Sequence, residues 1–81
     1  MDVIHMRLRI LTALARSGDV GLCRRQLRPL GTALSVSGAI QRSISSGHVR
    51  AEEGPMKNNR RLFITPKGMQ HLDWLIAQRG R

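Results

Sequence analysis

The segment from Thr32 to Gly47 limits most strongly how this chain can fold. Apolar side chains recur there every four residues, at Val36, Ile40 and Ile44, which is the spacing of one face of an α-helix. The other face offers small or hydrogen-bonding side chains, namely Ser35, Ser37, Gln41, Arg42 and Ser45. No acid lies in the segment, although exposed helices usually carry pairs of opposite charges. The segment predicts a short amphipathic helix whose outer face lies against a negatively charged partner, with DNA as the leading candidate.

The charge of the whole chain supports this expectation. Fourteen Lys and Arg residues against five acids give a net charge of +9 over 81 residues. Nine of the basic residues but only two acids lie between Arg24 and Lys67, and twelve of the fourteen are Arg, which bonds phosphate and guanine through two parallel contacts. Only Phe63 and Trp74 could stack on single-stranded bases, so duplex DNA is favoured.

Length and composition predict one domain, residues 1–81, with a modest aliphatic core that a dimer interface would supplement.

One cysteine allows no internal disulfide, and no apolar run reaches the roughly 18 residues of a membrane span. An amphipathic, Arg-containing start could act as a transit peptide, but its removal would take about a fifth of the domain. We therefore expect a cytoplasmic protein.

The first predicted helix runs from Val3 to Ser17, with Asp2 as its N-cap and Gly18 ending it. It carries two apolar stripes, one of Leu8, Leu11 and Ala15 and another of Val3, Met6, Ile10 and Ala13. One stripe would face the core and the other a second subunit, which makes Val3, Met6 and Ile10 candidate dimerisation residues. Alternatively, the helix lies in a deep groove of its own domain.

A second short helix is predicted from Leu22 to Leu30, closed by Pro29 and Gly31. Its inward residues are Leu22, Cys23, Leu27 and Leu30, and its outward residues are Arg24, Arg25 and Arg28. Together with the segment 32–47 it has the order of a helix-turn-helix, in which the second helix reads the groove.

After Gly47 the pattern alternates, which predicts two strands, His48–Glu53 and Arg60–Thr65, joined by a turn-rich connector into a two-stranded hairpin with a basic tip. Thr65 and Pro66 then begin a last helix that runs to about Gln78. We expect this helix to bury Met69, Leu72 and Ile76, with Trp74 and Leu75 flanking them.

This order is that of a winged helix-turn-helix, and two stretches resemble the MarR-type transcription regulators. The run Arg60–Gly68 is similar to the end of the wing in that family, where Thr-Pro-x-Gly opens a helix, and Gly47-His48-Val49 resembles the step that leaves the recognition helix. The resemblance covers roughly residues 22–75. It implies a mainly α fold with a small β-hairpin wing (α+β), in the order helix, helix, recognition helix, strand, strand, helix.

The resemblance also implies a function. It suggests a sequence-specific, double-stranded-DNA-binding transcriptional regulator, a repressor and a homodimer through the first and last helices, of bacterial, plasmid or phage origin. The sequence departs from the family in length, in Ser43, where an apolar residue is usual, in Gly38 within the helix, and in His48. Since family members are longer and use the extra helices to shape an effector pocket, we infer no small-molecule effector and no cofactor.

Three groups of residues are candidate DNA contacts. The first turns of a recognition helix enter the major groove, so Ser35, Ser37, Gln41 and Arg42 are candidates for base edges. The alternative is that Arg42 and the serines contact phosphate only. Arg24, Arg25 and Arg28 are candidates for the phosphate backbone, and Lys57, Asn59, Arg60 and Arg61 for phosphates or an adjacent minor groove.

Other chemistry has little support in the sequence. There is no nucleophile elbow, phosphate-binding loop or paired carboxylate, so we expect no enzyme. The histidines, His5, His48 and His71, are too scattered to predict a metal site. Cys23 is expected to be a small buried hydrophobe, with a redox thiol as the alternative. Two rival functions remain: an architectural or replication and partition accessory that binds DNA by charge, and a protein-interaction module.

Overall fold

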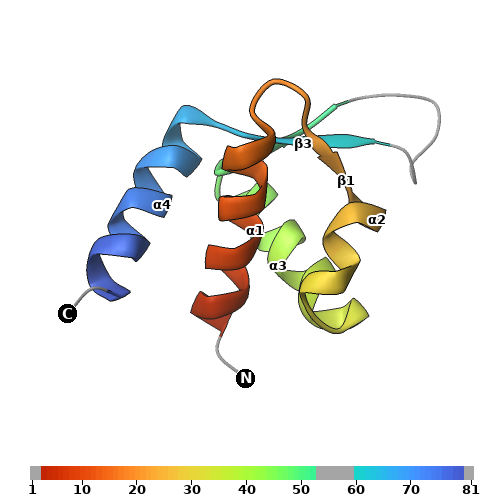
Figure 1. Cartoon of the computed structure of the whole chain (residues 1–81), viewed down its shortest axis with the longest axis horizontal. Helices are drawn as coiled ribbons and strands as arrows, with labels where there is room; N and C mark the ends of the chain where they lie inside the picture. The colour runs from red at the N-terminus through yellow and green to blue at the C-terminus, as the bar shows by residue number, and fades with distance from the viewer. Residues whose placement is uncertain (1–2, 53–59, 80–81) are drawn as a thin grey trace.

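The computed structural model describes residues 3–52 and 60–79 and has the expected α+β class (Figure 1). In chain order, the elements are α1 (Val3–Ser17), β1 (Leu22–Cys23), α2 (Arg24–Leu27), the 3-10 turn η1 (Arg28–Leu30), α3 (Ala33–Ser45), β2 (Val49–Ala51), β3 (Arg61–Ile64) and α4 (Pro66–Arg79). In these described residues, no helix has the length and apolar character needed to cross a membrane.

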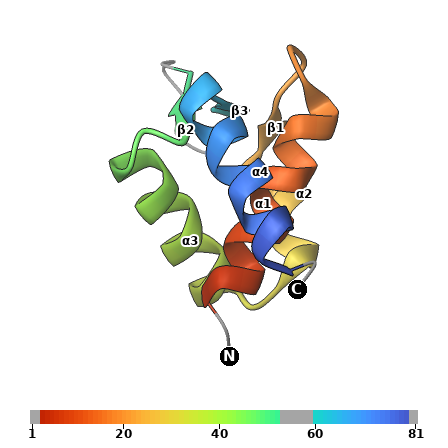
Figure 2. The same cartoon turned by 90° about the vertical axis from the view of Figure 1, so that its left-hand side faces the viewer.

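Helix α1 forms the centre of the molecule. It packs against α3, α4 and β3, and Figures 1 and 2 show it enclosed between the other helices beneath the sheet. Met6, Leu8, Ile10 and Leu11 are all buried, so both apolar stripes face the core of the same chain. The prediction that Met6 and Ile10 contact a second subunit is therefore wrong, because α3 and its neighbours already cover them. The side chain of Val3 lies outside the described part.

The sheet has three antiparallel strands in the order β1-β3-β2, one strand more than expected. In β1, Leu22 pairs with Leu62 and Cys23 with Arg61, so the prediction that Leu22 and Cys23 begin a helix is wrong. Their apolar side chains also suit the inward spacing of a helix, but the chain here takes its hydrogen bonds from β3 instead. Helix α2 is consequently reduced to a single turn.

Strands β2 and β3 confirm the alternation expected from the sequence. Val49 is opposite Ile64, and Ala51 is opposite Leu62. Val49 and Leu62 are buried, while Ala51 and Ile64 pack against the core from its edge. The sheet thus covers one end of α1 and carries the chain directly from the end of α3 to the start of α4.

Helix α4 begins at the expected residue but turns a different face to the core. Leu72 and Leu75 are buried, whereas Met69, Trp74 and Ile76 are exposed, which corrects the prediction that Met69 and Ile76 are core residues. The rotation follows from Gly68, where an added Cβ would overlap the carbonyl oxygen of His48 and lie 2.8 Å from Ile64 Cγ1. Because Gly68 must face these atoms, Leu72 and Leu75 face inward with it.

Candidate nucleic-acid interface

Side chains at the start of α3 fix where this helix begins. The backbone N–H of Ser35 donates to Thr32 Oγ1 at 3.1 Å, which satisfies one of the free donors of the first turn. The hydroxyl of Thr32 in turn donates to Ser35 Oγ at 2.7 Å. Ser35, a candidate for base contact, is half-buried and belongs to this cap. It sets the start of the helix rather than standing on its open face.

The end of α3 is fixed by the glycine that the sequence predicted. Gly47 has φ of +79°, a left-handed conformation that other residues rarely adopt. Its N–H donates to the carbonyl of Ile44 at 3.0 Å, and the N–H of His48 donates to the carbonyl of Ser43 at 2.9 Å. These two bonds are the Schellman pattern of a helix end, and they turn the chain from α3 into β2.

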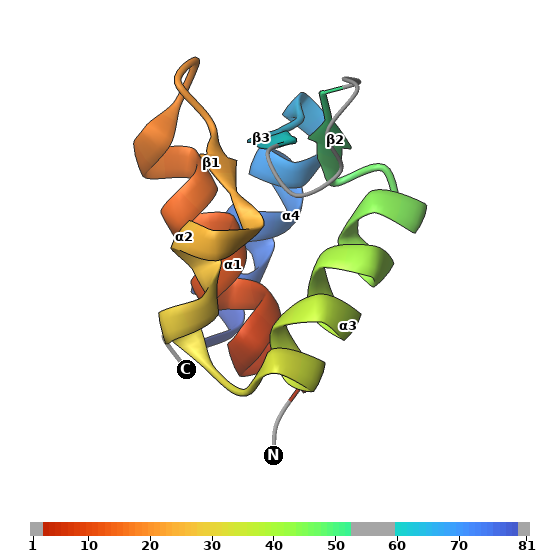
Figure 3. The same cartoon turned by 90° about the vertical axis from the view of Figure 1, so that its right-hand side faces the viewer.

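The two faces of α3 divide as the sequence predicted. Val36, Ala39, Ile40 and Ser43 are buried against the rest of the domain, and α1 is the main neighbour. Figures 2 and 3 show α3 at the side of the molecule, with its far face turned away from the other elements. The residues exposed on α3 beyond its first residue are Leu34, Ser37, Gln41, Arg42 and Ser45. Only Leu34 was not expected from the sequence.

Gly38 lies within α3 and gives space to a neighbouring arginine. The helix begins at Ala33, so Gly38 lies in its second turn. A Cβ at Gly38 would lie 3.5 Å from a terminal nitrogen of Arg42, one turn further on. The guanidinium group of Arg42 therefore lies back along the helix beside Gly38, on the exposed side of α3.

The junction between β3 and α4 holds the end of α3 through Thr65. The backbone N–H of Thr65 donates to the carbonyl of His48 at 3.0 Å, and its hydroxyl donates to the carbonyl of Gly47 at 2.6 Å. The same hydroxyl oxygen accepts the N–H of Gly68 at 3.0 Å, which makes Thr65 the N-cap of α4. One side chain thus joins the last turn of α3 to the first turn of α4.

The strands β2 and β3 contribute basic side chains of two kinds. Arg61 is exposed, and its Nη1 donates to the carbonyl of Val20 at 3.2 Å. Arg50, which the sequence did not single out, is exposed on β2, with its guanidinium carbon 4.6 Å from the centre of the Phe63 ring. Such a cation–π contact holds the charge in a defined place at the surface.

The remaining candidates for DNA backbone contact differ in how exposed they are. Arg60 is half-buried, and its Nε has no hydrogen-bond partner within the described residues. On α2, Arg25 is exposed and Arg24 is half-buried, while Arg28 is exposed at the start of η1. The remaining wing candidates, Lys57 and Asn59, lie outside the described residues.

Two histidines meet where α3 ends and α4 begins. The rings of His48 and His71 stack with centroids 4.2 Å apart and an interplanar angle of 10°, and the Trp74 ring stacks on His71 with centroids 5.8 Å apart. Burial lowers the pKa of His48, followed by the charges of His71, Arg7 and Lys67. Burial and Arg7 lower the pKa of His71. The lowered pKa favours the uncharged form of His48, whose ring packs against that of His71.

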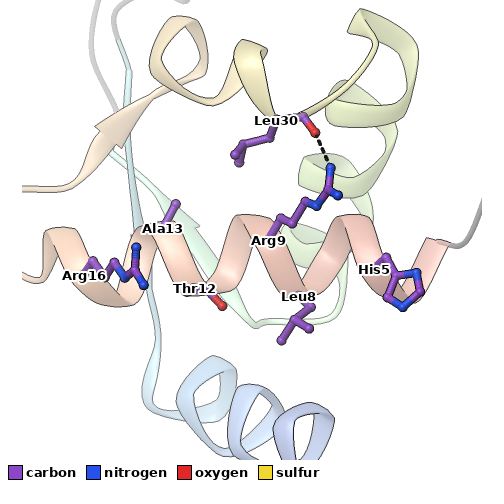
Figure 4. A pocket seen from close by; sticks show the side chains of 7 residues that line it. All are labelled: His5, Leu8, Arg9, Thr12, Ala13, Arg16 and Leu30. Carbon is purple, nitrogen blue, oxygen red and sulfur yellow. Dashed lines mark hydrogen bonds between the residues drawn. The ribbon is translucent and has the colours of Figure 1, made fainter. Parts of the chain in front are cut away.

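The structure also contains a hollow of about 460 Å³ lined by α1 and by Leu30 of η1 (Figure 4). Its lining residues are His5, Leu8, Arg9, Thr12, Ala13, Arg16 and Leu30. Arg9 is anchored there by donating to the carbonyl of Leu30 at 3.1 Å. No α3 residue lines this hollow, so it does not belong to the face that carries Gln41 and Arg42.

Among residues 3–52 and 60–79, no three His, Cys, Asp or Glu side chains gather closely enough to hold a metal ion. Cys23 is half-buried in β1, rather than fully buried as expected.

Comparisons with known proteins add no family to this description. No protein-family model matches the sequence, and searches of curated proteins and of solved structures gave no match either. The geometry of the chain itself therefore carries the functional argument.

Proposed function

We propose that this protein is a sequence-specific, double-stranded-DNA-binding transcription regulator of the winged-helix kind, similar to a minimal MarR-type protein. In this proposal α3 enters the major groove, and the basic residues of the strands contact the backbone or the adjacent minor groove. The protein acts as a repressor that blocks the promoter by occupying it.

The exposed face of α3 is the observation that carries this proposal. Ser37, Gln41 and Arg42 stand on it, it contains no acidic residue, and both helix ends are fixed by capping bonds. Gln can bond adenine and Arg can bond guanine, each through two contacts at the base edge. A rigid helix with short polar side chains can approach base edges closely, and no carboxylate would be repelled by the phosphates.

The strands supply two positively charged side chains as a second set of proposed DNA contacts. Arg50 and Arg61 are exposed on neighbouring strands, and each is held by a contact with Phe63 or with Val20. Side chains that are already ordered lose little entropy when they bind phosphate. Arg50 therefore joins the candidate backbone contacts that the sequence suggested.

A homodimer also forms part of the proposal, with α4 in place of α1 as its surface. Met69, Trp74 and Ile76 are exposed on α4, and their burial would supplement the small core of one domain. A two-fold dimer relates its two copies of α3 by the symmetry that relates the halves of an inverted repeat, which is the kind of site it would read.

Selection of bound sequences from a random duplex pool at roughly physiological salt tests this function. We expect an enriched inverted repeat, because non-specific binding at that salt is typically weaker than about 1 μM. Retention of DNA without any sequence preference would instead identify an architectural or partition accessory. Failure to bind DNA, together with tight capture of a protein partner, would identify an interaction module.

Single substitutions then distinguish residues that contact bases from residues that contact phosphates. Gln41→Ala and Arg42→Ala should each weaken binding to the selected site by about 1–3 kcal/mol and leave random DNA nearly unaffected. Arg61→Ala should weaken both DNAs alike and reduce the slope of affinity against salt concentration. Equal losses on both DNAs for all three variants would contradict base reading by α3.

A further inference from the structure

Leu34 is the most exposed of the large apolar side chains in the described residues, at 88% of its accessible area. It is the second residue of α3, directly after Ala33. Ser37 and Gln41 follow it at intervals of three and seven residues, so all three side chains lie on one face of the helix. Leu34 is therefore an apolar group in a polar, acid-free surface.

The position of Leu34 does not serve the stability of an isolated domain. The core face of α3 is formed by Val36, Ala39 and Ile40, which point the other way. At the first turn of a helix, an acidic side chain interacts favourably with the free N–H groups, and none is present here. A leucine at this position favours the helix by its propensity, but it gains hydrophobic free energy only if something covers it.

We propose that Leu34 packs on the C5-methyl group of a thymine in the major groove and so helps to determine the DNA sequence that is bound. This inference rests on the proposed DNA-binding function. The N-terminal residues of a recognition helix are those that reach base edges. Thymine presents the apolar group there, and the acid-free face that Leu34 shares with Ser37 and Gln41, on a chain of net charge +9, matches duplex DNA rather than an apolar protein surface.

The test replaces each thymine of the selected duplex, one at a time, by deoxyuridine, which removes the methyl group and leaves base pairing intact. For the unmodified protein we expect about a fourfold loss of affinity at one position of each half-site, the value for losing one buried methylene-sized contact. Leu34→Ala should bind the thymine duplex more weakly and should bind the thymine and uracil duplexes equally well.

Val20→Ala is the matched control, because Val20 is also an exposed apolar residue but lies in the loop before β1, and the substitution keeps the backbone carbonyl that accepts the bond from Arg61. This variant should retain the full sensitivity to deoxyuridine. The inference would be overturned if no thymine position affected the unmodified protein, or if Leu34→Ala remained as sensitive as the unmodified protein. The absence of any enriched sequence would instead refute the proposed function itself, so the two failures are distinguishable.

Discussion

The two terminal helices, α1 and α4, are of similar length and both carry many apolar residues, yet the structure uses them differently. In α1 the apolar positions Ile10, Leu11 and Leu14 are fully buried, since α3, α4 and the sheet surround this helix. In α4 only Leu72 and Leu75 are buried among the apolar residues. One helix supplies the core, and the other retains an apolar outer surface.

This difference shows that the number of apolar residues does not decide which helix is central. Helix α1 is buried because other elements lie on several of its sides, whereas α4 contacts mainly α1 and β3. A partner-facing surface is therefore expected on α4, where Trp74 and Ile76 remain more than half exposed. The following changes test this contrast.

The largest effect is expected from truncating matched isoleucines in the two helices. Ile10→Ala should lower the free energy of unfolding by about 2–5 kcal/mol, because it leaves a cavity in the core. Ile76→Ala should change that of the separated monomer by less than about 0.5 kcal/mol, because the side chain is 53% exposed in a single chain, so both variants are measured at a concentration at which the protein is monomeric. Urea denaturation of both variants measures the difference, and similar losses would contradict the contrast between α1 and α4.

A smaller effect is expected where α4 docks onto the end of α3. Gly68→Ala should lower the free energy of unfolding by about 1–3 kcal/mol, because the new Cβ would overlap the carbonyl of His48 and shift the helix. Gly38→Ala is the matched control: its Cβ meets only Arg42 at 3.5 Å, so it should stabilise α3 by up to about 1 kcal/mol. Thermal unfolding should therefore give shifts of opposite sign, and equal signs would refute the rigid contact at Gly68.

The stacked histidines should make the docking of α4 sensitive to acid. The pKa values of His48 and His71 lie below the ordinary value of 6.5, so the unfolded chain binds protons more readily. Stability should be complete above about pH 6.5 and should fall as the pH drops through the lowered pKa values. Burial disfavours both imidazolium groups, the charge of Arg7 adds to this for both, and the charges of His71 and Lys67 add to it for His48.

Urea denaturation between pH 7.5 and pH 5 measures this effect, and NMR titration of the ring protons measures both pKa values directly. His71→Gln removes one of the two facing charges and should reduce the acid-dependent loss of stability. An unchanged pH dependence in this variant, or ring pKa values above 6.5, would refute the role of the stacked pair.

The fold was predictable where a single local signal decides the outcome. The spacing of Val36, Ile40 and Ile44, with Gly47 at the end, was enough to predict α3 and its inward face. Strand β1 was not predictable in this way, because Leu22 and Cys23 also suit a helix start, and their pairing partners lie far along the chain in β3.

Which faces of the two terminal helices are buried could not be predicted without knowing the contacts between elements. In α4 two alternative faces have helical spacing, one with Met69, Leu72 and Ile76 and one with Leu72 and Leu75. Only the close contact of Gly68 with His48 determines that the second face is buried. On α3, the polarity of Ser37, Gln41 and Arg42 was enough to predict that they are exposed. Leu34 and Arg50 were missed, because a single leucine in a helix is normally read as a core residue and the contact of Arg50 with Phe63 depends on strand register.

The strand order β1-β3-β2 also has a consequence for the synthesis of the chain. The strand made last, β3, occupies the middle of the sheet, and Leu62 pairs with both Leu22 and Ala51. Until Arg61–Ile64 has left the ribosome, β1 and β2 are separate segments without a partner between them. The nascent chain therefore acquires its sheet, and the junction that fixes the end of α3, in one late step after all three strands have emerged.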